Sequence, residues 1–168
     1  MIKCVTQDKY GYIWIGTEYG LNKFDGYRFT HYLTDSKDTT SIASNDITDF
    51  FVDKDGQLWI GCEKGLMKYN YETNNFKRYN FPDGQKPRVT TILQEKNDNL
   101  LLATSGYGLY KIKDGTDVII KENSLRRGPS DDYKSRIFED GMGNLWQNSH
   151  LPVINKNSGR QERETRSV

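Results

Sequence analysis

Asp53-Lys54-Asp55-Gly56-Gln57-Leu58-Trp59 is the stretch that decides the fold, because its pattern of Asp, two residues, Gly, two residues and Trp recurs along the chain. Further copies run from Asp8 to Trp14 and from Asp140 to Trp146, and a weaker copy begins at Glu95 and ends on Leu101 instead of Trp. The last positions of the four copies lie 45, 42 and 45 residues apart. A spacing this regular indicates repeated structural units.

Each copy is flanked by the same order of short apolar segments. Around the second copy an apolar run from Ile47 to Val52 comes first, and Ile60-Gly61-Cys62, Gly65 to Asn70 and Phe76 to Tyr79 follow. Gly, Asp and Asn residues separate the segments, as expected of tight turns between antiparallel strands. We therefore predict an all-β chain built from β-propeller blades of four antiparallel strands, with about 3.5 to 4 blades in a partial propeller. The blades are expected at about residues 1–34, 35–80, 81–122 and 123–156.

The recurring positions are expected to act as structural anchors. In each turn the Asp is expected to accept hydrogen bonds from backbone amides, and the Gly to take a positive φ. The Trp rings could instead serve as platforms for sugars, but equivalent positions on equivalent strands favour packing between neighbouring blades. These anchors are Asp8, Gly11, Trp14, Asp53, Gly56, Trp59, Leu101, Asp140, Gly143 and Trp146.

Composition and charge exclude several classes of protein. The 11 Tyr, 7 Phe and 3 Trp against only two alanines argue against a helical bundle. A net charge of +1 makes nucleic acid an unlikely partner, and the chain has neither an apolar run long enough to span a membrane nor a signal peptide. The two cysteines, Cys4 and Cys62, are expected to be unpaired.

The repeats resemble the two-component regulator propeller family, whose copies read Asp-x-x-Gly-x-Leu-Trp-Ile-Gly-Thr followed by Gly-Leu and a basic-aromatic-Asp strand. The run from Gly20 to Phe29 is similar to the opening blade of the sensor half of hybrid two-component histidine kinases. The resemblance covers about residues 2 to 146 and implies periplasmic sensing of polysaccharide breakdown products, with the kinase absent from this chain. Without a signal peptide, a cytoplasmic or non-functional fragment stays an alternative.

The repeat count predicts how the blades are completed. A seven-bladed ring needs roughly 300 residues, whereas 168 residues supply roughly 3.8 repeats. We expect an open arc that is a remnant of a larger gene; a four-bladed closed ring and two chains completing one ring are the alternatives. The remaining blades or a second copy of the chain are therefore expected partners. The segment 151–156 is expected to form a degenerate strand, and the charged tail 157–168 to be disordered.

The sequence predicts no catalytic site, no metal site and no cofactor. Its two histidines, His31 and His150, have no nucleophile or carboxylate at a spacing that suggests catalysis, and the paired aspartates lie in turns. A propeller lyase would need a histidine and an acid facing the channel, which makes it the least favoured alternative. A propeller that binds proteins without a small ligand is the main rival of a saccharide sensor.

Ligands of propellers usually meet the loops on one face, around the channel. On this basis an oligosaccharide, particularly an acidic one, is the expected ligand. The residues that could stack on it or hydrogen-bond to it are Tyr19, Lys64, Tyr107, Arg126 and Arg127. No direct membrane contact is expected.

Overall fold

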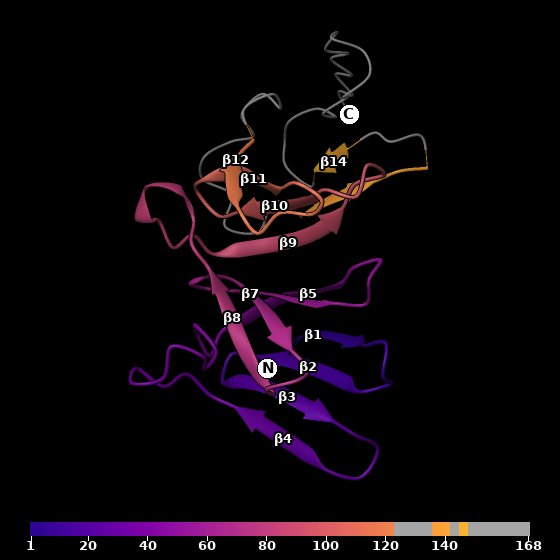
Figure 1. Cartoon of the computed structure of the whole chain (residues 1–168), viewed down its shortest axis with the longest axis vertical. Coiled ribbons are helices and arrows are strands. Elements are labelled where there is room, and N and C mark those ends of the chain that lie inside the picture. The colour runs from indigo at the N-terminus through magenta and orange to yellow at the C-terminus, as the bar shows by residue number, and fades with distance from the viewer. Residues whose placement is uncertain (123–135, 142–144, 148–168) are drawn as a thin grey trace, which may run out of the picture.

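The chain forms four antiparallel β-sheets in a computed structural model, which describes residues 1–122, 136–141 and 145–147 (Figure 1). Within each sheet every strand pairs with the next strand in chain order. Sheet 1 contains β1 (Ile2–Gln7), β2 (Ile13–Thr17), β3 (Gly20–Phe24) and β4 (Phe29–Tyr32). Sheet 2 contains β5 (Ile47–Val52), β6 (Leu58–Cys62), β7 (Gly65–Asn70) and β8 (Asn75–Tyr79). Sheet 3 contains β9 (Val89–Gln94), β10 (Leu100–Thr104), β11 (Gly108–Ile112) and β12 (Ile119–Lys121), and sheet 4 contains β13 (Ile137–Glu139) and β14 (Leu145–Gln147).

The sheets are stacked face to face along the long axis of the molecule (Figure 1). Their first strands run next to one another, since β1 contacts β5, β5 contacts β9, and β9 contacts β13. One short 3-10 helix, η1 (Pro82–Gly84), interrupts the connection from sheet 2 to sheet 3. Four-stranded sheets arranged around their first strands are the blades of a propeller, so the all-β prediction is confirmed.

The anchor side chains fill the spaces between sheets. Trp14 of sheet 1 is completely buried in one cluster with Leu58 and Ile60 of sheet 2. Trp59 of sheet 2 packs in the same way in a cluster with residues of sheet 3, and Leu101 of sheet 3 packs in a cluster with Leu145 of sheet 4. Each anchor therefore buries its apolar surface against the following sheet.

An aspartate holds each buried indole in place. The Oδ1 atom of Asp8 accepts hydrogen bonds from the backbone N–H groups of Tyr10 (2.9 Å) and Tyr12 (3.0 Å), and its Oδ2 atom accepts one from the Trp14 indole (2.7 Å). Asp53 makes the same bonds to its own turn and to Trp59. In both sheets the carboxylate binds the indole of the Trp six residues later in the chain. We call this contact, together with the turn that it closes, the Asp–Trp clamp. Asp140 also accepts a bond from the Trp146 indole, at 2.9 Å.

Sheet 3 lacks an indole at the anchor position. In sheets 1 and 2 a lysine lies over the ring of the Trp, Lys23 at 5.6 Å and Lys68 at 5.1 Å from the ring centroid. Leu101 offers no π face, and the lysine paired with it, Lys111, forms ion pairs with Glu95 (3.7 Å) and Glu122. Lys68 also forms an ion pair with Asp117 at 3.6 Å, so sheet 3 differs from sheets 1 and 2 in its lack of the lysine–indole contact and not in its use of ion pairs.

A lysine follows the first residue of each of the first three clamp turns and connects neighbouring sheets, whereas Gly141 holds this position in the fourth. Its ammonium group reaches the clamp turn of the next sheet, where it contacts a carbonyl or a carboxylate. The contacts are Lys9 Nζ to Asp55 O (3.1 Å), Lys54 Nζ to Asp98 Oδ2 (2.9 Å) and Lys96 Nζ to Gly141 O (2.7 Å).

Gly56 is required by this arrangement. Its φ is +73°, and a Cβ atom built on it would lie 2.3 Å from Cδ of Lys9. Any larger residue would have to displace the lysine and adopt a strained backbone conformation. In sheet 3 the same turn position is held by Asp98, whose φ is +66°.

The aromatic residues between Tyr27 and Tyr32 predict an outer strand of sheet 1 over this range, but Tyr27 and Arg28 lie in the β3–β4 turn. The Oδ1 atom of Asp25 accepts the backbone N–H groups of both residues, at 2.8 and 2.7 Å, so the strand begins only at Phe29.

Cys4 and Cys62 are unpaired, as expected. Among the described residues no helix has the length and apolar character to cross a membrane. The predictions for Gly143, Arg126, Arg127, residues 151–156 and the tail 157–168 concern positions outside the described residues.

Candidate functional site

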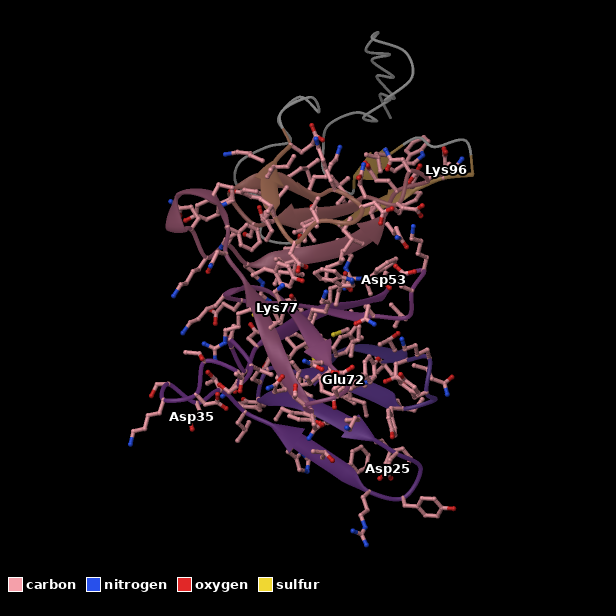
Figure 2. All side chains as sticks on the ribbon, in the orientation of Figure 1. Asp25, Asp35, Asp53, Glu72, Lys77 and Lys96 are labelled. Carbon is pink, nitrogen blue, oxygen red and sulfur yellow. The ribbon has the colours of Figure 1, made fainter. Side chains whose placement is uncertain are left out.

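The strand turns gather at two opposite ends of the sheets. The clamp turns and the β3–β4 turn lie at one end, which we call the clamp end. The turns β2–β3, β6–β7 and β10–β11, with the connections between sheets, lie at the other, which we call the loop end. Asp25, Asp53 and Lys96 lie on one side of the molecule and Asp35, in the first connection, on the opposite side (Figure 2).

Three of the predicted ligand residues lie at the loop end, on successive sheets. Tyr19 is in the β2–β3 turn, Lys64 in the β6–β7 turn and Tyr107 in the β10–β11 turn. All three side chains are exposed. The other two, Arg126 and Arg127, lie outside the described residues.

Hydrogen bonds fix the turns that carry these residues. The backbone N–H of Tyr19 donates to Oγ1 of Thr17 at 2.9 Å, and the N–H of Gly20 donates to the carbonyl of Asn45 in the next connection at 2.8 Å. The β10–β11 turn is held similarly, because the N–H of Ser105 donates to the carbonyl of Arg88 at 2.9 Å. The exposed tyrosines are therefore presented on backbone that is tied to the neighbouring connections.

A row of four charged side chains crosses the first strands at the loop end. Asp46 lies directly before β5 and contacts Lys3 of β1 (2.5 Å) and Arg88, which lies directly before β9 (2.7 Å). Lys3 also contacts Glu18 in the β2–β3 turn at 3.5 Å. This row, which we call the ion row, connects three sheets near the starts of their first strands.

Asp46, at the centre of the ion row, stays charged at neutral pH. Burial opposes the charged form of Asp46, but hydrogen bonds from Lys3 and then Arg88 outweigh it and hold the pKa of Asp46 below its usual value. The row supplies two cations and two anions, each partly accessible to water. Such a set of donors and acceptors can orient a polar ligand that the adjacent tyrosines contact through their ring faces.

Further along the first strands, the buried side chains of Asp49 and Cys4 are not reactive groups. Burial raises the pKa of Asp49, whose Oδ2 atom accepts the backbone N–H of Ile92 at 2.8 Å. Burial, followed by the nearby Asp49 carboxylate, raises the pKa of Cys4 to about 12. The Cys4 thiol is therefore protonated at neutral pH and is a poor nucleophile.

Two grooves lie at the clamp end, away from the predicted site. One groove, of about 450 Å³, lies between sheets 1 and 2, and the residues lining it include Tyr10, Tyr71 and Lys77. The other, of about 250 Å³, separates sheets 2 and 3, and residues lining it include Asp53 and Asp117. The hollows at this end are thus separate from the residues for which ligand binding was predicted.

No catalytic or metal-binding geometry occurs within residues 1–122, 136–141 and 145–147. His31 is exposed on β4, where its Nδ1 atom contacts Oδ1 of Asn22, and no group of His, Cys, Asp or Glu in these ranges could hold a metal ion. His150 lies outside them.

Two sets of residues escaped prediction from the sequence. One is the ion row of Lys3, Glu18, Asp46 and Arg88, and the other is the lysine of each of the first three clamp turns. The signals were present, since Asp46 and Arg88 each directly precede an apolar run and a lysine recurs after the first clamp residue. Neither pattern indicates which residue of another sheet the side chain contacts.

Residues 1–19 and 41–64 match the model of the two component regulator propeller family. These two segments therefore resemble two component regulator propeller repeats. The matched segments include the first two clamp turns and also Tyr19 and Lys64 at the loop end.

Similar proteins agree with this assignment. The chain is 51% identical over 39 residues to histidine kinase P4 of Formosa agariphila, a match that covers 23% of this chain and 3% of the kinase. The extracellular domain of a putative hybrid two component system from B. thetaiotaomicron superposes with a TM-score of 0.70 at 23% identity, over 93% of this chain and 28% of that domain. A virginiamycin B lyase from Staphylococcus aureus superposes with a TM-score of 0.62 at 12% identity, over 87% of this chain and 48% of the lyase.

These likenesses differ in what they establish. At identities of 23% and 12% the two solved structures establish the propeller fold alone. The family match supports the prediction that this chain is not itself an enzyme. The chain spans only a small part of the kinase that it matches.

Proposed function

We propose that this chain is part of the extracytoplasmic sensor propeller of a hybrid two-component system, and that its loop end recognises saccharides released from polysaccharides. Ligand binding there would change how the propeller contacts its neighbouring domains and so bias the kinase. The observation that carries the proposal is the match of residues 1–19 and 41–64 to the regulator propeller family, because these segments hold the first two clamp turns and also Tyr19 and Lys64 at the loop end.

The source of the similar structures supports the location. The B. thetaiotaomicron propellers are described as extracellular domains of two component systems, and the propeller of this chain has the same fold. A sensor located outside the cytoplasm would be exposed to saccharides released from polysaccharides.

The arrangement of the loop end supports the ligand class. Tyr19 and Tyr107 offer exposed rings that can cover the apolar face of a pyranose, and Lys64 lies on the sheet between them. The ion row beside the turns supplies donors and acceptors for hydroxyl and carboxylate groups. An acidic oligosaccharide would use both features.

A binding partner that is a protein is the second candidate. A protein partner is favoured because both grooves lie at the clamp end, so neither of them provides a pocket for a small ligand at the loop end. A polar surface with exposed tyrosines suits a protein interface as well as a sugar.

The test is a panel of neutral and acidic oligosaccharides, screened by thermal shift on the whole chain and then titrated by calorimetry. The double variant Tyr19→Ala, Tyr107→Ala is expected to weaken the best ligand about tenfold or more, equivalent to about 1.4 kcal/mol. Tyr10→Ala, which removes an exposed tyrosine at the clamp end, is the matched control and should leave affinity unchanged. Absence of binding by every member of the panel would reject saccharide recognition for this chain.

A further inference from the structure

Sheet 1 has an apolar face that no described residue covers. Its strands alternate, so that Trp14 points to sheet 2 while the intervening side chains point away from it. Two of the outward side chains are large and exposed, with Phe29 at 54% and Val5 at 58%. The apolar side chains of this face, which we call the outward set, are Val5, Ile13, Ile15, Phe24 and Phe29. The same pairings place the polar residues Gln7, Asn22 and His31 on this face, and Asn22 and His31 contact each other.

This outward face has an internal counterpart. When Trp14 is aligned with Trp59, the strand pairings place the outward set of sheet 1 at the positions of Phe50, Leu58, Ile60, Tyr69 and Phe76 in sheet 2. In sheet 2 these residues form the cluster that receives the Trp14 ring. The outward face of sheet 1 therefore has the form of a surface that receives a clamped indole.

A clamped indole without a described neighbour lies at the other end of the stack. Phe138 and Trp146 are paired across β13 and β14, their rings are stacked 6.2 Å apart, and the Trp146 indole is bonded to Asp140. They are 58% and 38% exposed, whereas Trp14, at the equivalent position, is completely buried. Their sheet packs on sheet 3 through its other side, which carries Ile137 and Leu145.

We propose that the outward face of sheet 1 receives the Phe138–Trp146 face of a second copy of this chain, in a head-to-tail contact. The two faces lie on the first and the last sheets of the stack, so they do not meet within one chain (Figure 1). The contact repeats the one that already joins sheets 1 and 2, and a net charge of +1 sets up little repulsion between copies. Because the two surfaces differ, the interface is heterologous.

The intermolecular contact lacks two bonds of its internal model, and the first is the bond from Lys9 to the Asp55 carbonyl, because Gly141 stands at the position of Lys9. The second is the bond that the Tyr71 hydroxyl of sheet 2 donates to Oδ2 of Asp8 at 3.1 Å. In the proposed contact Asp140 takes the place of Asp8, but Gly26 takes the place of Tyr71 and has no donor side chain. We therefore expect reversible association, with a dissociation constant on the order of 1–100 µM.

Three charge substitutions at exposed side chains test the contact. Phe29→Glu alters the receiving face, Phe138→Glu alters the indole face, and Val118→Glu, at a residue 64% exposed on sheet 3, is the matched control. The mass of the whole chain is measured by light scattering and sedimentation from about 1 to about 300 µM, a range that spans the expected dissociation constant. Circular dichroism checks that each variant is folded.

The wild-type chain and Val118→Glu should gain mass with concentration, while Phe29→Glu and Phe138→Glu should each remain monomeric alone. An equimolar mixture of Phe29→Glu and Phe138→Glu should form dimers and nothing larger, because each variant retains the face that the other lacks. A wild-type chain that stays monomeric throughout would overturn the proposal. So would association of either single-face variant on its own, or failure of the mixture to form dimers.

Discussion

Removing the acceptor of the first Asp–Trp clamp should destabilise the chain severely. Asp8→Ala leaves the buried Trp14 indole and the half-buried Tyr71 hydroxyl without their acceptor, and also frees the backbone N–H groups of Tyr10 and Tyr12. An unpaired buried donor costs about 1–3 kcal/mol, and water replaces part of the loss at the exposed turn. We expect the free energy of unfolding to fall by about 4 kcal/mol, a large share of the total for a typical domain.

The assay is equilibrium urea unfolding followed by Trp fluorescence and circular dichroism, with an unchanged dependence on urea concentration as evidence of a folded variant. Asp8→Asn should lose about half as much, because its oxygen can still accept the two turn amides while its NH₂ group faces the indole N–H. Asp25→Ala is the matched control: Asp25 also accepts two turn amides, but it is fully exposed and holds no indole, so its loss should be far smaller. Equal losses for Asp8→Ala and Asp25→Ala would refute the clamp as a stabilising contact.

Three further changes probe the packing and the charges. Gly56→Ala should cost about 2 kcal/mol in urea unfolding because its methyl group collides with a lysine of sheet 1, whereas Gly26→Ala, which has open space and a similar positive φ, should cost about 1 kcal/mol; equal costs would count against the collision. Hydrogen bonds from Lys77 and then Tyr79 lower the pKa of Asp117 from 3.8 to about 2, so the stability that it contributes is present above pH 4 and is lost as pH falls through 2. Asp117→Asn should remove that part of the acid dependence, and an unchanged profile would exclude the ion pair. Burial raises the pKa of Cys62 to about 11, so its thiol should resist alkylation at pH 7.5 in the native chain and react in urea; rapid native labelling would contradict the buried placement.

The fold could be predicted because the repeat is short and its chemistry is local. The Asp and Gly of each clamp specify one turn, and the residues that they pair are at most six positions apart. The start of β4 was harder, because aromatic residues at Tyr27 and Phe29 favour a strand equally. The side chain of Asp25 decides between them by accepting the amides of the turn.

A residue of the candidate site could be predicted only where the turn that places it is specified by the sequence of the same repeat. Tyr19 and Tyr107 follow from the turn in which each lies. Asp46, by contrast, takes its role from Lys3 and Arg88, which are more than 40 positions away on other sheets, and no period in the sequence shows which charged side chains will meet. The same holds for the lysine of each of the first three clamp turns, which recurs visibly but contacts the following sheet.

The most direct test of the proposed function is an NMR titration of the whole ¹⁵N-labelled chain with the oligosaccharide that gives the largest thermal shift. The proposal predicts that the perturbed amides cluster at the loop end, around Tyr19, Lys64 and Tyr107 and beside the ion row at Asp46. Perturbations confined to the grooves of the clamp end, or none at saturating sugar, would contradict it.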